Sequence, residues 1–335
     1  MKIIHFHRNP QTGFHSIENM YAEIRKILRA QGVQIRKVQL PFTCKSHLGK
    51  LLNTIYTFFF RADVYHMTGD AHYIAMVLPR NKTLISAHSV EGGRKELVGW
   101  KGRLYKWLYF IIPDRHAKYW TTVSNFTRQE LLDYIHCKPE KVKIIANPLL
   151  PVFLKSPKKF CTTQPIFLQV GTNPRKNIPN LLHAIQSLPC RLHLVGLPSE
   201  EEKRLLDKYQ IDYKITPKAS PKEMNTLYKE CDAMVMVSLN ESFGMPIIEA
   251  QQVGRVVLTS EVTAMPEIGA DAAVYVNPYQ VDSIRAGIER IISDHSLRLR
   301  LIEKGYKNVQ RFDMEWIAQQ YLDLYKEIAD AQKNH

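Results

Sequence analysis

The segment AMVMVSLNESFGMPIIEAQQV, residues 233–253, contains the most informative pattern in the chain. Its first five residues form an apolar run, which predicts a buried strand. Farther along, Ile247, Ile248 and Val253 fit one face of a helix. Pro246 lies where the first turn of a helix tolerates proline. The segment therefore predicts a strand, a short loop and the start of a helix.

Two glutamates flank this predicted helix start. Glu241 lies in the loop, and Glu249 follows eight residues later in the first turns of the helix. A helix N-terminus offers free backbone N–H groups and a partial positive charge, which favour phosphate. Carboxylates bind hydroxyl groups instead, so the two side chains suit hydroxylated groups on either side of a diphosphate. The pattern describes a nucleotide-sugar site, although two glutamates at this spacing also occur on solvated helix faces.

The segment resembles the E-x7-E signature of the retaining glycosyltransferases of family 4, the glycosyl transferases group 1. The resemblance is dense from Ile166 to about Phe312 and thinner in the N-terminal half. It implies an α/β protein of the GT-B fold, in which two Rossmann-like domains with parallel sheets face each other across a cleft. It also implies a C-terminal helix that crosses back to the first domain.

The order of elements along the chain agrees with two parallel sheets. Short apolar strands alternate with helical patterns, which indicates sheets with helices on both faces. The strands expected in the first half are 2–6, 33–38, 64–67, 83–87, 120–124 and 142–146. Those expected in the second half are 166–170, 191–195, 233–237, 255–259 and 273–276.

The domain boundaries follow from a segment rich in Pro, Lys and Ser at residues 147–164. We expect an acceptor-binding domain at residues 1–155 and a nucleotide-sugar donor-binding domain at residues 160–312. The closing helix at residues 313–335 is expected to return to the first domain.

The second domain opens with IFLQVGTNPRKNIPNLLHAI, residues 166–185, which predicts a strand, a loop with two cations, and a helix. This pattern resembles the donor-binding loop of the family, in which a lysine contacts the donor diphosphate, and it implies that role for Lys176. Gly171 permits close approach of the backbone to a ligand. Many relatives carry arginine where this chain has Thr172, so Arg175 is the candidate for a second phosphate contact. The alternative is that Arg175 and Lys176 form a solvated loop pair.

The resemblance also implies a role for each part of the E-x7-E segment. Glu249 is expected to accept hydrogen bonds from the ribose hydroxyls, and Glu241 to meet the sugar hydroxyls of the donor. The backbone N–H groups of Phe243, Gly244 and Met245 are expected to hold the diphosphate. With Lys176, Glu241 is a candidate catalytic residue.

Candidate acceptor-side residues follow the strands of the first half. His88 lies at the end of strand 83–87, and carboxyl ends of parallel strands face the binding crevice of open sheets. The resemblance places His88 near the donor sugar as a third candidate catalytic residue, with Ser89 where relatives often carry aspartate. His66, Asp70 and His72 are weaker candidates. An ordinary hydrogen-bonded histidine is the common alternative for each of the thirteen histidines.

Three further positions complete the candidate site. In the loop after the first strand, Arg8 is a candidate for a phosphate contact, and Gly13 for close approach of a ligand. The loop 215–219 is expected to contact the nucleobase, whereas Glu267 is interpreted as structural.

Neither half contains the G-x-G-x-x-G of dinucleotide-binding enzymes, and no Asp-x-Asp metal motif occurs. A helix terminus and Lys176 suffice to neutralise a diphosphate, so no metal or other cofactor is expected, and the nucleotide sugar is a co-substrate. No carboxylate can be assigned as a covalent nucleophile. We therefore expect the acceptor hydroxyl to attack from the face that the diphosphate leaves, with retention of anomeric configuration.

The net charge of +14 comes from the N-terminal half. Residues 1–160 carry 26 Lys and Arg against 10 Asp and Glu, whereas residues 161–335 carry 20 against 22. Such a half is expected to meet an anionic partner: a membrane surface, a phosphorylated acceptor or nucleic acid. Nucleic acid is not favoured, because no recognised nucleic-acid motif occurs. The five scattered cysteines indicate reduced thiols in a cytoplasmic protein.

Two apolar stretches of the basic half bear on membrane attachment. In residues 97–112, Trp100, Leu104 and Trp107 fit one helix face among lysines and arginines, which suits an anionic bilayer interface. A domain core is an equal alternative there, and it is favoured for the helix-like run 48–60. We expect a cytoplasmic protein, peripheral on the cytoplasmic face of the inner or plasma membrane.

These observations favour one function and leave two open. The favoured function is transfer of a hexose-type sugar from a nucleotide-diphosphate sugar to a hydroxyl of a glycan or lipid-linked acceptor. Its setting is expected to be synthesis of a cell-surface polysaccharide, such as lipopolysaccharide or capsule, or of a glycolipid. The alternatives are a nucleotide-sugar-binding protein without transferase activity, such as an epimerase or inactive partner subunit, and a basic nucleic-acid-binding protein.

Overall fold

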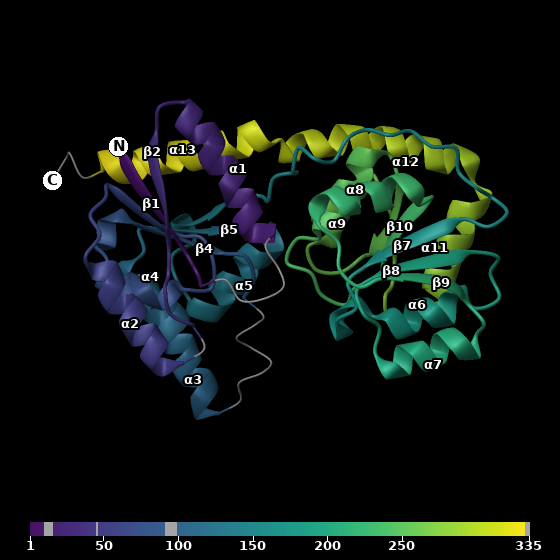
Figure 1. Ribbon diagram of the computed structural model, residues 1–335, viewed down its shortest axis with the longest axis horizontal. Coiled ribbons are helices and arrows are strands. Elements are labelled where there is room, and N and C mark those ends of the chain that lie inside the picture. Colours follow the sequence, from purple (N-terminus) through teal and green to yellow (C-terminus); the bar gives the residue numbers. More distant parts are fainter. Residues whose placement is uncertain (10–15, 45, 91–98, 332–335) are drawn as a thin grey trace. The chain divides into compact units, whose positions relative to one another are not determined.

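The computed structural model describes residues 1–9, 16–44, 46–90 and 99–331. The chain divides into two compact units (Figure 1). The N-terminal unit comprises Met1–Pro148 together with Met314–His335, and the C-terminal unit comprises Leu149–Asp313.

The N-terminal unit is built on a parallel six-stranded sheet in the order β2-β1-β3-β4-β5-β6. Its strands are β1 (Lys2–His7), β2 (Gln34–Gln39), β3 (Val64–Met67), β4 (Thr83–Ala87), β5 (Tyr119–Thr122) and β6 (Val142–Ile144). The longer helices are α1 (Ser16–Ala30), α2 (His47–Phe58), α5 (Asn125–Ile135) and α13 (Met314–Asp330). The shorter ones are η1 (His72–Val77), α3 (Trp100–Lys106), the π-helical turn η4 (Trp107–Ile111) and α4 (Ile112–His116).

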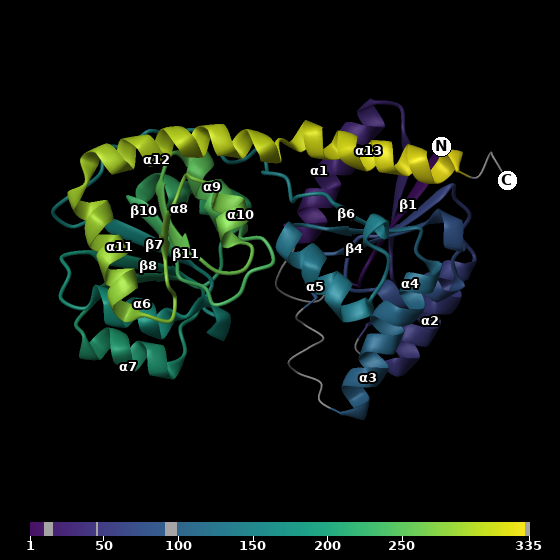
Figure 2. The same cartoon turned by 180° about the vertical axis from the view of Figure 1, so that it is seen from behind.

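The C-terminal unit repeats this plan, with the strand order β12-β11-β10-β7-β8-β9. Its strands are β7 (Ile166–Val170), β8 (Arg191–Val195), β9 (Asp212–Thr216), β10 (Ala233–Met236), β11 (Val256–Ser260) and β12 (Val274–Val276). Its helices are α6 (Ile178–Ile185), α7 (Glu200–Lys208), α8 (Pro221–Glu230), α9 (Met245–Val253), α10 (Met265–Gly269), α11 (Val281–Ser293) and α12 (His295–Asn308). Figure 2 shows the same elements from behind.

Burial explains why these segments are strands. Strands β3, β4, β10 and β11 are buried along their whole length, as expected of central parallel strands covered by helices on both faces. In the C-terminal unit, helices α7 and α8 begin at polar caps: Ser199 and Ser220 each form a capping box with a glutamate three residues later.

Three expectations from the sequence are corrected. Strand β9 is not among the predicted strands, because its sequence DYKIT is polar and lies half-exposed at the sheet edge, so the predicted loop 215–219 begins inside it. The stretch 97–112 is not one regular helix, because a π-helical turn interrupts it at Trp107–Ile111, and Leu97 and Val98 lie outside the described residues. The run 48–60 is not core on its apolar side, since Leu48, Leu51 and Phe59 are exposed.

Helix α13 returns to the N-terminal unit and is tied to it by buried hydrogen bonds. The hydroxyl of Tyr325 lies 2.8 Å from His5 Nε2 and 2.7 Å from His66 Nδ1. The other ring nitrogen of His66 lies 2.7 Å from Ser86 Oγ. Tyr321 of the same helix lies 3.0 Å from the hydroxyl of Tyr21 on α1. The predicted fold, with two parallel-sheet domains and a returning C-terminal helix, is confirmed.

Burial keeps this histidine cluster uncharged. It lowers the pKa of His5 and of His66 well below 6.5, and neighbouring histidines add to the effect. The pKa of His7 falls to about 3, first through burial and then through the charge of Arg25, whose guanidinium lies 2.7 Å from its Nε2. The N-terminal unit therefore contains several neutral imidazoles that only the unfolded chain protonates near pH 6.

We predict that the N-terminal unit loses stability as the pH falls below 6.5. There the unfolded state binds protons that the folded state excludes, and each such histidine costs about 1.4 kcal/mol per pH unit. In His66→Gln the free energy of unfolding should fall less steeply as the pH is lowered. The slope should correspond to about one proton fewer taken up on unfolding. Urea denaturation followed by tryptophan fluorescence reports on this unit, because it holds all four tryptophans: Trp100, Trp107, Trp120 and Trp316. An identical slope in the variant would contradict a neutral His66.

Candidate functional site

The strand order of the C-terminal unit creates a place for a ligand. The chain builds β7, β8 and β9 toward one edge of the sheet and then crosses to build β10, β11 and β12 toward the other. The loops that follow β7 and β10 therefore leave the sheet in opposite directions, and open α/β sheets bind ligands at such a switch point. These two loops contain the donor-loop residues and Glu241, and Glu249 lies in helix α9, which follows the second loop.

The loop after β7 folds a lysine back over a glycine. Gly171 has φ +85°, and a Cβ on it would lie 2.9 Å from Lys176 Cε. A side chain at position 171 would therefore strain the backbone and push the lysine away. Arg175 is exposed on this loop, and its carbonyl accepts a hydrogen bond of 2.8 Å from the N–H of Leu239 in the loop after β10.

Lys176 and Glu241 form an ion pair across the two loops. The lysine Nζ lies 2.6 Å from Glu241 Oε1, and the side chains are only 12% and 17% exposed. Two charges so shielded from water need each other or a charged ligand. The backbone of Glu241 is held in turn, since its N–H donates to Thr263 Oγ1 at 3.1 Å.

Helix α9 begins at this switch point as predicted. Gly244 adopts φ +97° at the N-cap, and Met245 and Pro246 form the first turn. Within the described part of the chain, the N–H groups of Phe243, Gly244 and Met245 have no hydrogen-bond acceptor. They are available to an anion, which a helix N-terminus also attracts through its dipole. The Phe243 side chain has a separate, structural role, since it packs edge-on against Phe312.

Glu249 lies one turn farther into α9 and is partly buried. Its Oε2 accepts a 2.8 Å hydrogen bond from the hydroxyl of Tyr228 on α8. Burial raises the pKa of Glu249 to about 7, although the hydrogen bond and the charge of Lys176 lower it. Lys176 thus acts on both glutamates, pairing with Glu241 and shifting the titration of Glu249.

The site also depends on residues that were not predicted. Asn177 joins three loops, because its Nδ2 donates to Val237 O at 3.2 Å and to Pro278 O at 2.7 Å. Gly196, after β8, has φ +124°, and a Cβ there would lie 2.7 Å from the Thr172 hydroxyl. A glycine directly after a strand was a usable signal for Gly196. No local pattern marks Asn177 or Tyr228, whose partners lie far away in the sequence.

The candidates of the N-terminal unit lie directly after β1, β3 and β4. The strand order of this unit also reverses between β1 and β3, so two of these strands flank its own switch point. Arg8 lies 2.8 Å from Asp70 Oδ2 and 3.3 Å from Glu18 Oε1, so any phosphate must compete with two carboxylates. The Nε2 of His88 lies 3.4 Å from the Tyr21 hydroxyl. Burial lowers the pKa of His88 to about 4, although the carboxylate of Asp70 opposes this. Gly13 lies outside the described residues.

Two weaker candidates are core residues. His66 is fully buried, with both ring nitrogens hydrogen-bonded inside the unit. His72 is buried among aromatic rings, and its Nδ1 lies 3.1 Å from the carbonyl of Tyr109. Their positions favour the ordinary interpretation over a role in a site.

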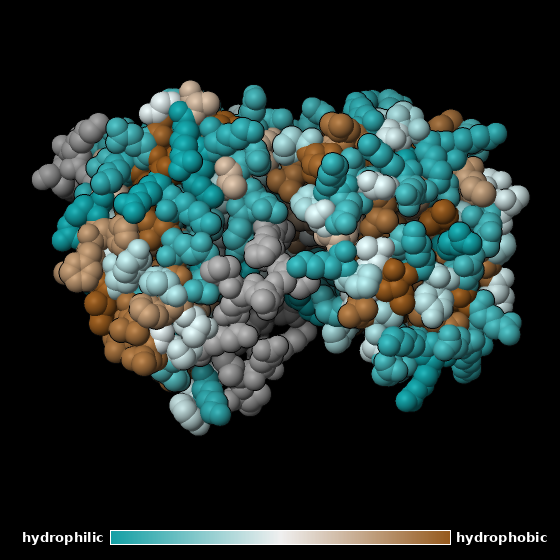
Figure 3. All heavy atoms as spheres, viewed as in Figure 1, coloured by the Kyte–Doolittle hydropathy of each residue, from teal (hydrophilic) through white to brown (hydrophobic). Residues whose placement is uncertain are grey.

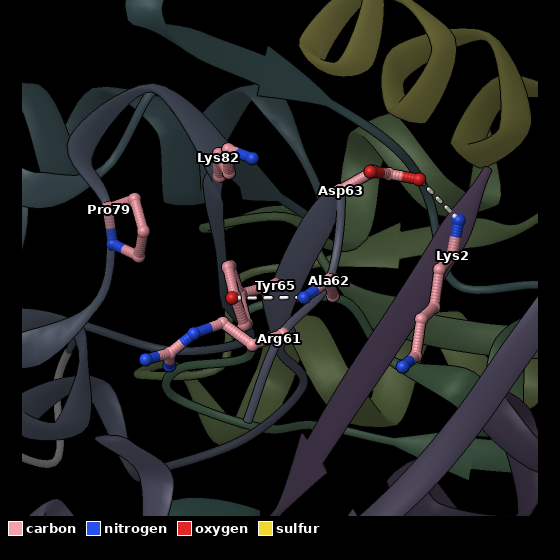
Figure 4. A pocket seen from close by; sticks show the side chains of 7 residues that line it. All are labelled: Lys2, Arg61, Ala62, Asp63, Tyr65, Pro79 and Lys82. Atoms are coloured by element: carbon pink, nitrogen blue, oxygen red, sulfur yellow. Dashed lines mark hydrogen bonds between the residues drawn. The ribbon is translucent and has the colours of Figure 1, made fainter. Parts of the chain in front are cut away.

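A surface hollow of about 360 Å3 in the N-terminal unit lies away from these candidates. Figure 4 shows its lining, which includes Lys2, Arg61, Asp63 and Lys82. These residues precede or begin β1, β3 and β4, so the hollow lies at the amino edge of the sheet, opposite to His88. The described residues contain no group of three or more His, Cys, Asp or Glu arranged to hold a metal ion.

These observations define a class of protein, an α/β chain of two parallel-sheet units with a candidate anion site at a helix start. A family model, Glycosyl transferases group 1, matches residues 153–308. The C-terminal unit therefore matches this family, which confirms the resemblance seen in its motifs.

Individual relatives agree with the family. O-antigen chain mannosyltransferase B of Escherichia coli is 30% identical over 237 residues, which cover 63% of this chain and 61% of that relative. The chain thus spans about three fifths of the length of this curated relative. Among solved structures, sucrose-phosphate synthase from Thermosynechococcus elongatus has a TM-score of 0.80 at 18% identity, covering 99% of this chain and 100% of that one. WaaG, a glycosyltransferase involved in lipopolysaccharide biosynthesis, has a TM-score of 0.73 at 16% identity, covering 96% and 99%. These likenesses concern the fold, which is GT-B.

We predict that Glu249→Gln becomes more stable relative to the unchanged protein as the pH rises. A carboxyl whose pKa is raised by folding contributes its full stability below the unfolded value of 4.5 and loses it as the pH rises through about 7. The amide has no such loss, so the difference should grow by about 1–3 kcal/mol across this window. Calorimetry between pH 4.5 and 8 measures it, with the exposed Glu201→Gln as control. A difference that is constant with pH would contradict the burial of the Glu249 carboxyl.

Proposed function

We propose that this protein is a retaining hexosyltransferase, which moves a sugar from a nucleotide diphosphate to a hydroxyl of a glycan or lipid-linked acceptor. The observation that carries the proposal is the meeting of Lys176, Glu241 and the N–H groups of residues 243–245 at the start of α9, at the switch point of the C-terminal sheet. These groups supply positive charge for a diphosphate and an acceptor of hydrogen bonds beside it.

Each group has a defined part in the proposed reaction. Lys176 leaves its ion pair with Glu241 and binds the donor diphosphate instead. There it stabilises the negative charge that grows as the diphosphate leaves. The N–H groups of Phe243, Gly244 and Met245 bind the same phosphates, and Arg175 reaches them from the exposed side of the loop.

The released carboxylate of Glu241 then accepts hydrogen bonds from the donor sugar. Glu249, oriented by Tyr228, accepts them from the ribose. The acceptor hydroxyl forms its bond to the anomeric carbon on the face from which the diphosphate leaves, so the sugar keeps its anomeric configuration. The departing phosphate oxygen takes the proton of that hydroxyl. His88 is assigned to the sugar as a neutral imidazole, consistent with its lowered pKa.

The proposed setting is synthesis of a cell-surface polysaccharide or glycolipid. It is supported by the relative named as an O-antigen chain mannosyltransferase and by the fold neighbour from lipopolysaccharide biosynthesis. We place the protein in the cytoplasm, peripheral on an anionic membrane surface, because its N-terminal half carries the excess positive charge. None of the described helices combines the length and apolarity needed to cross a bilayer.

We predict that one series of nucleotides raises the melting temperature of the protein. A ligand at a hundred times its dissociation constant adds about 2.7 kcal/mol to the free energy of unfolding. Thermal melting with UDP, GDP, ADP, CMP and dTDP series identifies the base.

Glu249→Ala should remove the shift, and Lys176→Ala should lower kcat/KM by about 100-fold or more, as for other groups that stabilise developing charge. The exposed Lys222→Ala is the matched control. An equal loss in both lysine variants would contradict the assigned role of Lys176.

We also predict that the product keeps the anomeric configuration of the donor and that a strong chelator leaves activity intact. NMR of the product and an assay with excess EDTA measure the two outcomes. An inverted product would refute the proposed attack, and complete loss of activity with EDTA would show that a metal is required. Interconversion of the nucleotide sugar without any acceptor would instead identify an epimerase.

A further inference from the structure

Helix α2 of the N-terminal unit presents its apolar face outward and its polar face inward. Its buried residues are Gly49, Asn53 and Thr57. The side-chain amide of Asn53 has three hydrogen bonds there. Its Oδ1 accepts from the N–H of Phe42 at 3.1 Å, and its Nδ2 donates to the carbonyl of Phe42 and to the hydroxyl of Tyr73, each at 3.0 Å. Surface helices of soluble domains normally have the opposite arrangement, with polar residues in water.

The outward face of α2 and its C-terminal end form a continuous apolar row. Exposed side chains recur at one helical face and just beyond it: Leu48, Leu51, Ile55, Phe58 and Phe59. Phe59 is 74% exposed. Figure 3 shows hydrophobic side chains gathered over α2 on this side of the unit. A contiguous patch of this kind marks an interaction site rather than the scattered apolar residues of an ordinary surface.

Helix α3 extends the apolar surface. Lys50 of α2 lies 5.4 Å from the ring centre of Tyr109, which follows α3 in the π-helical turn, so the two regions are neighbours. Figures 1 and 2 show α2 and α3 close together from both sides. Trp100 and Trp107 are exposed on this second helix and turn. Of the eighteen large hydrophobic side chains exposed among the described residues, ten belong to Phe42–Phe59 or Trp100–Trp107.

The charge around this surface has one sign. The chain has no Asp or Glu between Glu23 and Asp63, a stretch with eight Lys and Arg, and none between residues 97 and 113. At the C-terminal end of α2, Arg61 borders the hollow that also contains Lys2 and Lys82 (Figure 4). Its one acid, Asp63, accepts a 2.7 Å hydrogen bond from the main-chain N–H of Lys2. The surface therefore combines an apolar face with a cationic rim.

We infer that α2 is a membrane-docking helix, which lies in the interface of an anionic bilayer with its apolar row among the acyl chains. The cations at its end and on α3 meet lipid phosphates. A second copy of the chain is a poorer occupant, because a symmetric dimer through α2 would bring two cationic rims together. The inference deepens the proposed membrane attachment by naming the surface and the lipid class, and it does not depend on sugar transfer.

Docking through α2 also sets the orientation of the N-terminal unit. The helix connects the end of β2 to the start of β3, so it runs from the carboxyl edge of the sheet to the amino edge. Its first turn therefore lies near the edge that carries Arg8 and His88. With α2 in the interface, its first turn brings this edge close to the membrane surface, as transfer to a lipid-linked acceptor would require.

The test compares vesicle binding of two variants with equal starting exposure. Leu51 on α2 and Leu299 on α12 are both 57% exposed. In sedimentation with vesicles of phosphatidylcholine and about one third phosphatidylglycerol, at about 0.15 M salt, the unchanged protein should bind. Leu51→Glu should weaken binding by at least about tenfold, and Leu299→Glu should not. Arg61→Ala should weaken it about fivefold, and only for anionic vesicles.

The outcomes separate this inference from the proposals on which it builds. If the unchanged protein fails to bind anionic vesicles, both membrane attachment and docking through α2 are wrong, and sugar transfer to a soluble acceptor is unaffected. If Leu51→Glu and Leu299→Glu bind equally well, attachment uses another surface and α2 is not the docking helix. If Leu51→Glu instead converts a dimer to a monomer in size-exclusion chromatography, α2 is a protein interface. A urea transition of Leu51→Glu, followed by tryptophan fluorescence, that matches the transition of the unchanged protein confirms that the N-terminal unit of the variant is folded.

Discussion

The ion pair between Lys176 and Glu241 is the interaction on which the C-terminal unit depends most. It joins two loops that lie 65 residues apart in the chain and are neighbours only because β7 and β10 pair at the switch point. The two conformations that make it possible are strained for most residues: Gly171 and Gly244 both have positive φ. A shielded pair of opposite charges holds the two loops together, and a ligand with its own negative charge can take the place of the carboxylate.

The two units solve different physical problems. The C-terminal unit concentrates free N–H groups and a shielded ion pair at one sheet edge. The N-terminal unit devotes its polar interior to holding α13: a chain of hydrogen bonds runs from His5 through Tyr325 and His66 to Ser86. Burial lowers the pKa of both imidazoles, so the attachment of the last helix is coupled to the protonation of the core. The exposed apolar row remains outside, on α2, and exposed tryptophans of α3 and of the turn after it extend this surface.

Much of the fold could be predicted, and the failures have physical causes. Fully buried strands such as Val64–Met67 and Thr83–Ala87 are mostly apolar, and the predicted bounds agree with the structure. Strand β9 was missed because an edge strand needs no apolar residues on its outer side. Helix α2 was misjudged because its apolar period is real but points away from the core. Periodicity specifies that a helix has two faces, and it does not specify which one is buried.

The sequence by itself determined the local parts: the strands, the glycines at the turns, the spacing of Glu241 and Glu249, and the charge of the N-terminal half. These depend on residues near one another in the chain, or on simple totals. Only the tertiary structure decided that Tyr228 holds Glu249, that Asn177 joins three loops, and that Lys176 faces Glu241. The reason is that such pairs form across a sheet whose strand order brings together segments that are distant in the sequence. The same packing decides that the polar side of α2 contacts Tyr73 and that its apolar side is exposed.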